Sequence, residues 1–479
     1  MGFQSFSKTS RGDIDRIVMG GSQMIGIGLV AGSGTRARPL TLKTANYLRS
    51  KAAIRFLGRP IIEWQIDSMK ADGIQDFIMV ARGRENRFQV KTLIGYGEGH
   101  GVSVRYSPPI LDHLDRGSAD ATIRSAEYFD LEGELFIFPV DSLIDLDMAT
   151  LARVHRRRRP AMTIITTEVV GAKVANTYGV LILDERGRVQ DFLEKPSPAI
   201  LKDRFGPHWA TLPLTTNAGF YLTRAEVLRE QALHMEISHM RSHQLDFGHD
   251  LLPWLVRQNL LVQAFPARWV GDLGSLPQYL ESMVDLLSGV ATPPGFDLGP
   301  DQHPPLHHFG VARPPGSASP WTTVRLGRYV HVGPDCHFRN VSIGDECLIG
   351  RGVTLEDVHL DDGVIIGDGA VIRSSVVGLM ATIHSSSDHP TYIEKISGIG
   401  DEAVIESGAH LENVLVYPRT TVKPNVHIIG PAVIQPGSTS LRARGRRVQV
   451  QARLLGRALK GGGSLHVPSR IHKVRSASV

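Results

Sequence analysis

The sequence places a short glycine-rich turn directly after its first apolar segment. Residues 25–41 read IGIGLVAGSGTRARPLT. At Gly32, Ser33 and Gly34, backbone N–H groups can approach phosphate oxygens with little interference from side chains. Arg36 follows, and a guanidinium at this point neutralises a pyrophosphate by two parallel hydrogen bonds. Because the Gly-Lys-Ser/Thr ending of a P-loop is absent, the turn predicts a phosphate site of another kind.

Two aspartates follow apolar segments that have the character of buried strands. Asp141 comes after residues 135–139, and Asp272 comes after residues 265–270. In an open α/β sheet, a carboxylate at the carboxyl end of a strand lies at the crevice where ligands bind. Mg²⁺ prefers one or two carboxylates together with phosphate oxygens and water. The two aspartates therefore predict a Mg²⁺ site that faces a triphosphate.

A third group combines a lysine with hydrogen-bonding side chains. Glu194 and Lys195 follow the apolar segment 189–193, and Asn217 lies in the segment TTNAGFY. The ammonium group of a lysine in this position suits the charge of a phosphate. A carboxylate accepts hydrogen bonds from sugar hydroxyls, and an amide both donates and accepts them. These residues predict contacts with a phosphorylated sugar.

The elements that must position these residues form an α/β pattern. Between residues 24 and 287, short apolar segments alternate with helical stretches, which predicts a mostly parallel sheet covered on both faces. Residues 288–320 are rich in Pro and Gly without periodicity and are typical of a linker. We expect residues 1–23, which are polar and Gly/Ser-rich, to be a mobile extension, and residues 441–479 to be a basic tail.

From residue 321 to residue 440 the pattern changes to an aliphatic or aromatic residue at every sixth position. The register contains Val332, Phe338, Ile343, Ile349, Leu355, Ile366, Ile372, Ile399, Ile405, Leu411, Val422 and Ile428. Such a hexapeptide repeat predicts short strands that stack into a β-solenoid. A period of six is incompatible with an amphipathic helix, whose faces repeat near 3.6 residues. Residues 378–398 interrupt the period and predict a loop outside the coil.

The composition is that of an ordinary globular protein. The chain has 479 residues, 42% hydrophobic and 21% charged, which allows two to four domains. No segment approaches the roughly 18 apolar residues of a membrane span, and no apolar stretch typical of a secretory signal stands near residue 1. The two cysteines, Cys336 and Cys347, are too few for a disulfide framework or a four-thiolate zinc site. We therefore expect a cytoplasmic protein.

The net charge of +5 comes from the C-terminal tail. Residues 442–479 contain ten Lys or Arg and no acid, so subtracting ten from +5 leaves −5 for residues 1–441. A solvated terminus is the simpler interpretation of such a tail, although it suits phosphates or an acidic surface as well. Because no nucleic-acid-binding motif accompanies it, we expect neither nucleic acid nor a membrane as partner.

The segment 25–41 resembles the signature of the sugar-1-phosphate nucleotidyltransferases, or nucleoside-diphosphate-sugar pyrophosphorylases. Further motifs that resemble this family follow in the family's order: RSKAAIRF (49–56), RGSADA (116–121), VDS (140–142), YGV (178–180), EKP (194–196), TNAGFY (216–221) and WVGDLGS (269–275). RGSADA and DFGHDLLP (246–253) are most similar to the glucose-1-phosphate adenylyltransferase branch. The resemblance covers roughly residues 25–430. It implies a Rossmann-like nucleotidyltransferase domain followed by a left-handed parallel β-helix.

The resemblance also implies a reaction, a cofactor and a set of site residues. The reaction joins a nucleoside triphosphate and a sugar-1-phosphate to give a nucleoside-diphosphate sugar and pyrophosphate, with Mg²⁺. The implied catalytic residues are Arg36, Lys51 and Lys195. The implied nucleotide contacts are Gly32, Ser33, Gly34, Thr35, Gly117 and Asp141. The implied sugar contacts are Gly179, Glu194, Lys195 and Asn217, and the implied metal ligands are Asp141 and Asp272.

The sequence departs from the family pattern at two points. The segment LKTANYLRS between Thr41 and Lys51 is several residues longer than the family usually has, so Lys43 is an alternative to Lys51. The segment GRPIIEW (58–64) is closer to the general sugar nucleotidyltransferases than to the adenylyl branch. Guanine as the base, and another hexose or a cyclitol phosphate as the second substrate, are therefore alternatives.

The repeat domain raises two alternatives of another class. Hexapeptide coils also build acyltransferases, for which His384, His389 and His410 are candidate general bases. A non-catalytic regulatory subunit that binds nucleotide or sugar phosphate is the other alternative. We expect the coil to serve oligomer packing or an effector site between the domains, and we expect a homo-oligomer.

Overall fold

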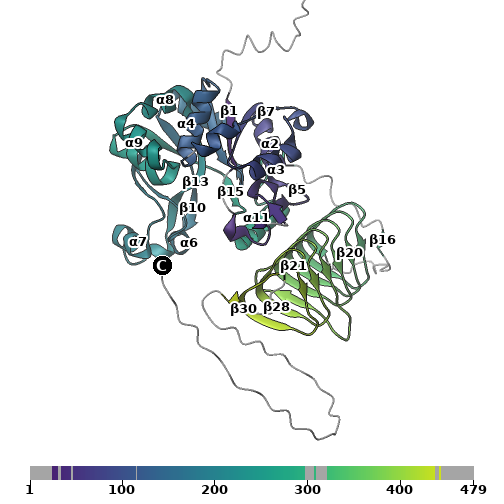
Figure 1. Cartoon of the computed structure of the whole chain (residues 1–479). Coiled ribbons are helices and arrows are strands. Elements are labelled where there is room, and N and C mark those ends of the chain that lie inside the picture. The colour runs from purple at the N-terminus through teal and green to yellow at the C-terminus, as the bar shows by residue number, and fades with distance from the viewer. Residues whose placement is uncertain are drawn as a thin grey trace, which may run out of the picture.

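The computed structural model describes residues 24–30, 34–44, 47–114, 116–296, 307–308, 321–436 and 442–443. The predicted N-terminal extension 1–23, most of the predicted linker 288–320 and nearly all of the predicted basic tail lie outside the described residues. Figure 1 shows an N-terminal domain of helices and strands beside a C-terminal stack of strands. None of the helices in the described part of the chain has the length and apolar character needed to cross a membrane.

A nine-stranded sheet forms the centre of the N-terminal domain. Its order is β12-β11-β13-β8-β1-β6-β7, with β10 paired to β13 and to β14. The central strands β8, β1, β6 and β7 run parallel, whereas β13 is antiparallel to β8. The strands are β1 (Ile25–Val30), β6 (Asp76–Ala81), β7 (Ser103–Tyr106), β8 (Glu134–Pro139), β10 (Met162–Val170), β11 (Val180–Leu183), β12 (Val189–Leu193), β13 (Pro213–Arg224) and β14 (Val262–Pro266). The predicted Rossmann-like domain is thus present around a parallel centre.

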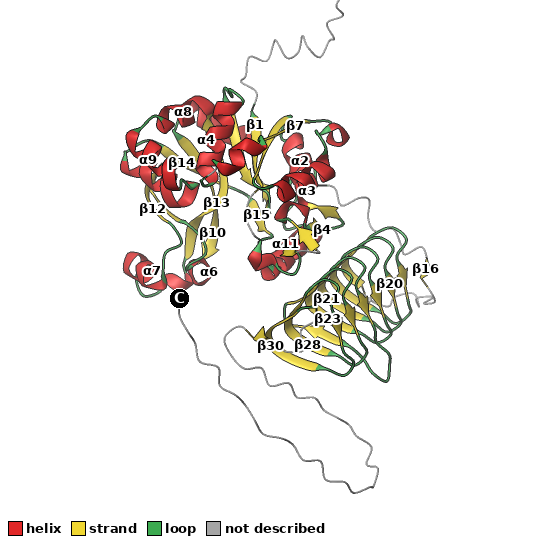
Figure 2. Ribbon diagram, in the orientation of Figure 1, coloured by secondary structure: helices red, strands yellow, loops and turns green. Residues whose placement is uncertain are grey.

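Helices cover both faces of this sheet, as Figure 2 shows. Along β8, Leu135 and Ile137 pack in one apolar cluster with α4, α8 and α10, while Phe136 and Phe138 pack in another with α2, α3 and α5. The alternation follows because successive side chains of a strand point to opposite faces. The helices are α2 (Ile61–Ala71), α3 (Arg84–Ile94), α4 (Ser118–Tyr128), α5 (Met148–Arg158), α6 (Gly171–Val174), α7 (Pro198–Phe205), α8 (Ala225–Ala232), α9 (Met235–His243), α10 (Leu252–Arg257) and α11 (Leu276–Leu287).

Short elements at the strand ends complete the N-terminal domain. Three two-stranded pairs form, in the combinations β2–β3, β4–β5 and β9–β15. Their bounds are β2 (Leu42–Thr44), β3 (Tyr47–Arg49), β4 (Arg55–Phe56), β5 (Arg59–Pro60), β9 (Ser142–Asp145) and β15 (Trp269–Asp272). Two single turns of 3₁₀ helix, η1 (Thr35–Ala37) and η2 (Lys51–Ala53), lie on either side of the β2–β3 pair.

The C-terminal domain is built of parallel strands that stack coil upon coil, consistent with a β-helix. Leu355 pairs with Phe338 on one side and with Ile372 on the other, and contacts between neighbouring coils recur at a separation of 17 residues. One sheet contains β16 (His307–His308), β18 (His331–Val332), β20 (Leu348–Ile349), β22 (Ile365–Ile366), β24 (Thr382–Ile383), β27 (Val404–Ile405) and β29 (Thr421–Val422). The other contains β17 (Trp321–Leu326), β19 (His337–Ile343), β21 (Thr354–Leu360), β23 (Val371–Val377), β25 (Tyr392–Glu394), β26 (Ser397–Ile399), β28 (His410–Val416), β30 (His427–Ile434) and β31 (Arg442–Ala443). We call this part the coil domain.

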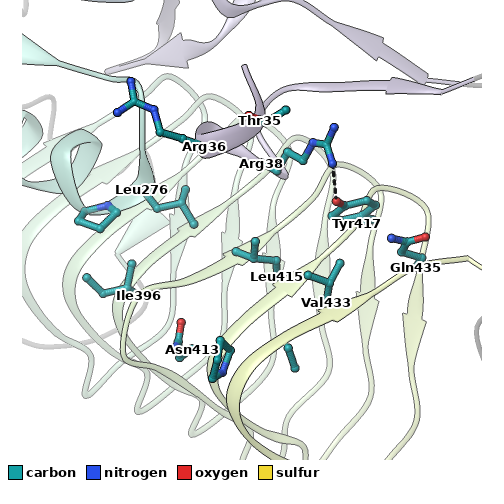
Figure 3. Close-up of a pocket in the computed structure, with 13 residues that line it drawn as sticks. Thr35, Arg36, Arg38, Leu276, Ile396, Asn413, Leu415, Tyr417, Val433 and Gln435 are labelled. Atoms are coloured by element: carbon teal, nitrogen blue, oxygen red, sulfur yellow. Dashed lines mark hydrogen bonds between the residues drawn. The ribbon is translucent and has the colours of Figure 1, made fainter. Parts of the chain in front are cut away.

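Helix α11 and the turn around η1 are the parts of the N-terminal domain that lie against the coil domain. Leu276 and Tyr279 of α11 belong to one apolar cluster with Val376 of β23. Next to this contact, a pocket of about 550 Å³ opens between the η1 turn and the last coils, lined by Thr35, Leu276, Leu415 and others (Figure 3). The coil domain therefore lies directly against the η1 turn, residues 34–41.

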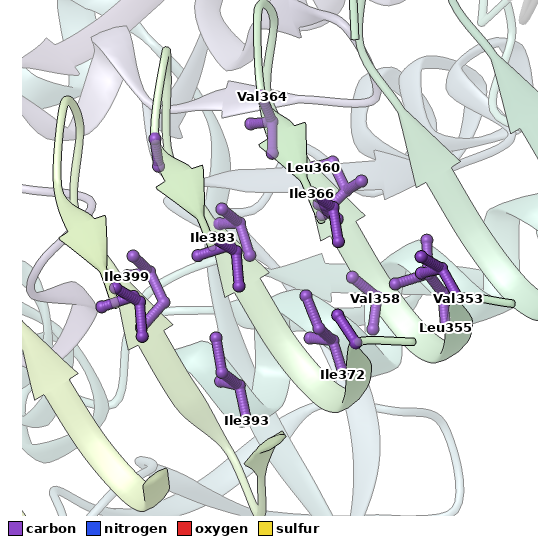
Figure 4. Packing of buried hydrophobic residues seen from close by; sticks show 14 of the residues in the cluster. Val353, Leu355, Val358, Leu360, Val364, Ile366, Ile372, Ile383, Ile393 and Ile399 are labelled. Carbon is purple, nitrogen blue, oxygen red and sulfur yellow. The ribbon is translucent and has the colours of Figure 1, made fainter. Parts of the chain in front are cut away.

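Aliphatic side chains fill the interior of the coil domain in successive layers, with Leu355, Ile372, Ile393 and Leu411 each fully buried (Figure 4). The predicted loop at 378–398 is wrong, because β24, β25 and the first two residues of β26 lie inside this range and pair with their neighbours on both sides. The added residues enlarge one corner of a coil, and the aliphatic layers continue past it. Period alone does not distinguish such an enlarged corner from a complete break.

Candidate active site

Lys51 and Asp141 form the first ion pair of the site. Asp141 lies two residues after β8, and Lys51 is the first residue of η2. Lys51 Nζ donates a hydrogen bond to Asp141 Oδ2, and the two side chains are 21% and 15% exposed. The structure therefore brings these two predicted residues together. Lys43, the alternative to Lys51, lies in β2, and its side chain is outside the described part of the chain.

Asp272 lies next to Asp141 because two short strands pair at this point. β15 runs antiparallel to β9, with Asp272 opposite Ser142. The Leu273 N–H donates a hydrogen bond of 3.0 Å to the Asp141 carbonyl. Two carboxylates that are far apart in the sequence are thus held at one edge of the sheet, beyond the carboxyl end of β8, as the strand-end pattern predicts.

Hydrogen-bond donors surround the Asp272 carboxylate. Oδ1 accepts from the Gly274 N–H at 2.7 Å, and Oδ2 accepts from Gln278 Nε2 at 2.7 Å and from the Tyr178 hydroxyl at 3.5 Å. Burial raises the pKa of Asp272, the hydrogen bond from Gly274 opposes this, and the negative charge of Asp141 raises the pKa again. The result is a pKa above the ordinary value of an aspartate.

The two carboxylates suit a divalent cation. The charge of Asp141 disfavours the ionised form of Asp272, and a cation shared between them relieves this repulsion. Mg²⁺ prefers oxygen ligands and is held in proteins by one or two carboxylates, with phosphate and water as the remaining ligands. The residues present therefore fit the predicted metal.

The glycine-rich turn ends in a conformation that favours glycine. Gly34 has a φ of 59°, and a Cβ atom there would lie 2.7 Å from Thr41 Oγ1. Thr41 Oγ1 donates a hydrogen bond to the Gly34 carbonyl, which ties the two ends of the η1 turn together. Gly32 and Ser33, the other predicted phosphate contacts of this turn, lie outside the described residues.

Arg36 extends from the η1 turn toward Asp272. A Cβ atom on Gly274 would lie 3.3 Å from Arg36 Nη2 and 2.8 Å from Asp272 Oδ1. In Figure 3 the guanidinium groups of Arg36 and Arg38 point in opposite directions, and Arg38 reaches the coil domain. The structure therefore gathers Arg36, Lys51, Asp141 and Asp272 in one place. We call these four residues the charged cluster.

Gly179, Glu194, Lys195 and Asn217 form a second group, which we call the polar group. The Asn217 N–H donates to the Gly179 carbonyl at 2.9 Å, and a Cβ atom on Gly179 would lie 2.9 Å from Glu194 Oε2. Lys195 Nζ lies 3.3 Å from Glu194 Oε1, with 59% of its side chain exposed. Asn217 Nδ2 donates to the Tyr221 hydroxyl at 2.9 Å. The sequence-predicted sugar contacts are thus assembled around one edge of the sheet.

Tyr178 connects the charged cluster to the polar group. It precedes Gly179, and its hydroxyl contacts Asp272 and accepts a hydrogen bond from Gln278. Burial, with the charge of Asp272 next, raises the pKa of Tyr178 to about 12, so the phenol stays protonated at neutral pH. Gln278 was not predicted from the sequence; it lies in the first turn of α11, and its Oε1 accepts from Ser275 Oγ at 2.5 Å. The spacing Ser-x-x-Gln, which is typical of helix starts, is the sequence signal that marks this turn.

The RGSADA and DFGHDLLP motifs contact each other. Gly117 has a φ of 126°, and a Cβ atom there would lie 2.4 Å from the Leu245 carbonyl oxygen. The Ser118 N–H and Oγ donate to Asp246 Oδ1 at 2.8 and 3.0 Å. Burial raises the pKa of Asp246, but hydrogen bonds from Ser118 and Gln244 outweigh it and hold the pKa below its ordinary value. The loop that begins α4 is therefore firmly placed.

The chain is similar in sequence to enzymes that act on different nucleotides and sugar phosphates. A UTP–glucose-1-phosphate uridylyltransferase of Synechocystis sp. is 27% identical over 369 residues, which cover 73% of this chain and 86% of that protein. A glucose-1-phosphate adenylyltransferase of Aliivibrio fischeri is 24% identical over 421 residues, 79% of this chain and 99% of that protein. A mannose-1-phosphate guanyltransferase of Hypocrea jecorina is 25% identical over 416 residues, 86% of this chain and 100% of that protein.

Two family models also match the sequence. The model of the GMPPB C-terminal domain matches residues 322–434. The nucleotidyl transferase model matches residues 25–289, more than half of the chain. The resemblance stated from the motifs is therefore confirmed at the level of the family, and the chain belongs to the nucleotidyl transferase family.

Proposed function

We propose that this enzyme joins a nucleoside triphosphate and a sugar-1-phosphate, and releases pyrophosphate. The observation that carries the proposal is the convergence of the charged cluster and the polar group, which Tyr178 connects. One group suits the phosphates of a nucleotide and the other suits the hydroxyls and phosphate of a sugar. This arrangement supports a nucleotide and a sugar phosphate that bind end to end.

In the proposed reaction, a phosphate oxygen of the sugar-1-phosphate attacks the α-phosphorus of the nucleotide in line. A new P–O bond forms while the bond from the α-phosphorus to the bridging oxygen breaks, and pyrophosphate leaves with the electron pair. Because the attacking oxygen is already ionised, no general base is needed. Catalysis therefore consists of positioning and charge neutralisation.

The residues of the site divide this work. Arg36 binds the departing pyrophosphate, Lys51 balances the charge near the triphosphate, and Lys195 holds the attacking phosphate. Glu194 and Asn217 bind sugar hydroxyls beside Gly179. Asp141 and Asp272 would hold a Mg²⁺ ion, which would supply further neutralisation of the phosphate charge. The remaining nucleotide contacts are the backbone of residues 32–34, Thr35 and Gly117.

Two pairs of base and sugar are supported by a motif or a domain match, and the uridylyltransferase relative supports UTP and glucose-1-phosphate as well. The contacting motifs at Gly117 and Asp246, which resemble the adenylyl branch, favour ATP and glucose-1-phosphate. The match of residues 322–434 to the GMPPB C-terminal domain, together with the mannose-1-phosphate guanyltransferase relative, favours GTP and mannose-1-phosphate. We rank the adenylyl reaction first and the guanylyl reaction second, with another hexose or a cyclitol phosphate as the third alternative.

The test is a grid of pyrophosphate release with Mg²⁺. ATP, GTP, UTP and dTTP are each paired with glucose-1-phosphate and mannose-1-phosphate. A single active pair establishes the reaction and assigns base and sugar together. Nucleotide binding without turnover in any pair points to a different sugar-like phosphate or to a regulatory subunit. The absence of both turnover and nucleotide binding would overturn the proposal.

Other predictions from the sequence belong to the same proposal. The separation of 17 residues between coils is close to three stretches of six, which supports the predicted hexapeptide β-helix. Its left-handedness stays a prediction from the family resemblance. The domain boundaries 24–287, 288–320 and 321–440, and assembly as a homo-oligomer, also stay predictions. Cys336 and Cys347 are buried free thiols, which supports the predicted cytoplasmic location.

A further inference from the structure

The extra residues between Thr41 and Lys51 form a small hairpin. β2 and β3 pair antiparallel, with Leu42 opposite Arg49. The hairpin begins at Leu42, directly after Thr41 of the η1 turn, which carries Arg36, and it ends at Arg49, two residues before Lys51. Two segments of the charged cluster are therefore joined by this insertion, and the position of the hairpin affects both.

The hairpin is fastened to the coil domain by one carboxylate. Arg49 Nη2 lies 2.5 Å from Asp401 Oδ2, Arg49 Nη1 donates to Oδ1 at 3.3 Å, and the Tyr47 hydroxyl donates to Oδ2 at 2.7 Å. The Arg49 side chain is 14% exposed and the Asp401 side chain 6% exposed. A two-oxygen contact of this kind fixes orientation as well as distance.

Asp401 is itself rigidly held in the coil domain. It lies in the turn between β26 and β27, where its Oδ1 accepts from the Leu379 N–H at 3.1 Å. Its carbonyl accepts from the Arg419 N–H at 2.8 Å. Burial raises the pKa of Asp401 above its ordinary value, and the charge of Arg49 opposes the rise. The carboxylate is therefore an anchor that belongs to the stacked coils.

The coil domain also touches the η1 turn, which precedes the hairpin. Arg38 Nη1 donates to the Tyr417 hydroxyl at 3.4 Å. A Cβ atom on Gly398 would lie 2.6 Å from Pro39 Cδ, so the coil backbone packs closely against the η1 turn. On the side of Lys51, the Ser50 N–H donates to Gln89 of α3 at 2.7 Å. The insertion is thus braced between two domains.

We propose that Asp401 of the coil domain is a positioning residue for the active site, which acts through Arg49 and Tyr47 on the placement of Lys51 and Arg36. Asp401 contacts neither substrate nor the reacting atoms. Its role is to hold the hairpin so that the charged cluster keeps the geometry that phosphoryl transfer needs. This inference rests on the proposed function, and it makes the coil domain a working part of the catalytic site.

The test compares Asp401→Asn with Glu402→Gln. Both variants remove one negative charge from the same turn, but among the described residues Glu402 is ion-paired with Arg419 of the next coil, in an exposed contact, and not with the hairpin. With the substrate pair that the grid selects, we expect kcat of Asp401→Asn to fall about tenfold, since small misplacements of catalytic groups are costly. We expect KM to change less than kcat, and Glu402→Gln to match the wild type.

Amide hydrogen exchange provides a readout that needs no turnover. We expect faster exchange at residues 34–51 in Asp401→Asn and unchanged exchange there in Glu402→Gln. Tyr47→Phe removes the hydroxyl contact with Asp401 and should change kcat and the exchange rate in the same direction as Asp401→Asn, by a smaller amount. If Asp401→Asn does not fold, Tyr47→Phe takes its place in the test.

The possible outcomes separate this inference from the proposed function. If the wild type is inactive with every pair, the exchange data alone decide whether Asp401 holds the hairpin, and the proposed function fails only when nucleotide binding is absent as well. If the wild type is active and Asp401→Asn equals Glu402→Gln in both kcat and exchange, the inference is overturned. Faster exchange with normal kcat also overturns it, because the hairpin then moves without consequence for the reaction.

Discussion

Two ion pairs made by residues only two positions apart end in different regions of the molecule. Lys51 meets Asp141 in the charged cluster through a single contact, and both side chains retain some exposure. Arg49 meets Asp401 at the domain junction through two oxygens, with Tyr47 as a further donor. A lysine is a compact charge that can exchange partners, whereas an arginine fork fixes geometry. One short segment thus supplies the active site with Lys51, a charge that can change partners, and supplies the contact between the domains with Arg49, a charge held in one geometry.

The largest loss of turnover is expected from a change in the pair of Lys51 and Asp141. Asp141→Asn removes a ligand charge from the site while keeping the shape of the side chain, so turnover should fall by about 10²–10³-fold or more. The apparent unfolding temperature should change little, because the Asp141 side chain lies at a partly exposed strand end. Pyrophosphate release and thermal unfolding measure the two quantities. Near-normal turnover would remove Asp141 from the metal site.

A smaller loss should separate the two arginines of the η1 turn. Arg36→Ala removes the charge proposed to bind pyrophosphate, so kcat should fall by about 10²-fold. Arg38→Ala is the matched control, because its guanidinium points to Tyr417 in the coil domain. We expect its effect on kcat to be at most a few-fold. Equal losses for the two variants would contradict the assignment of Arg36.

The ion pairs between the N-terminal domain and the coil domain, which we call the junction, should contribute to the free energy of unfolding. Arg55 Nε lies 2.6 Å from Asp361 Oδ1, and its Nη2 donates to Asp362, so Arg55→Met leaves the 5% exposed Asp361 without this cation. Breaking a largely buried pair in this way should cost about 2 kcal/mol or more of unfolding free energy. Chemical denaturation monitors the change. Arg204→Met, which breaks an exposed pair with Asp191, should have little effect.

The smallest expected effect is a pH dependence at the junction. Burial, with the charges of Arg325 and Arg55 next and Asp362 opposing, lowers the pKa of His359 from 6.5 to about 3. His359 lies against Tyr279, and neither ring nitrogen has a hydrogen-bond partner within the described part of the chain. The unfolded chain therefore binds more protons than the folded one between about pH 3 and pH 6.5. The contribution of the buried, neutral His359 to the free energy of unfolding is therefore complete above pH 6.5 and is lost as the pH falls toward 3.

His359→Phe tests this contribution directly. The unfolding midpoint of the wild type should drop between pH 7.5 and pH 5, and the drop should be smaller in the variant. His155 of α5 offers a comparison in the N-terminal domain, since burial lowers its pKa to about 4 while its Nδ1 contacts Thr163 at 2.8 Å. If the unfolding midpoint of His359→Phe depends on pH in the same way as that of the wild type, the burial of neutral His359 does not contribute to the pH dependence.

Much of the site could be predicted from the sequence because its residues follow strands. Asp141 follows β8, and Asp272 follows the segment that begins with β14; the two strands run in the same direction and deliver both positions to one edge of the sheet. Glu194 stands just after β12, which runs antiparallel to β11, so only the family motif pointed to it. The nucleotidyltransferase motifs supplied the rest of the assignment, including Lys51, which the structure pairs with Asp141. The layered coil was also foreseeable, since an aliphatic side chain that recurs in register leaves few other folds.

What could not be predicted depends on contacts between distant segments. Gln278 contacts Asp272 only because α11 starts at a particular angle, and the Ser-x-x-Gln pattern shows a helix start without its direction. The meeting of Arg49 with Asp401 depends on how two domains dock, and the sequence between them carries no record of this. The mistaken loop at 378–398 has a similar cause, because a coil corner tolerates added residues that break the period.

The last coil has a consequence for association. β31 pairs antiparallel with the outer edge of β30, where Val433 is opposite Arg442. An open strand edge offers unpaired N–H and C=O groups to any other chain, and proteins commonly cover such edges to avoid uncontrolled aggregation. β31 therefore covers part of the last strand edge, at Ala432 and Val433. Its loss would leave the backbone groups of these two residues open to pairing with another chain.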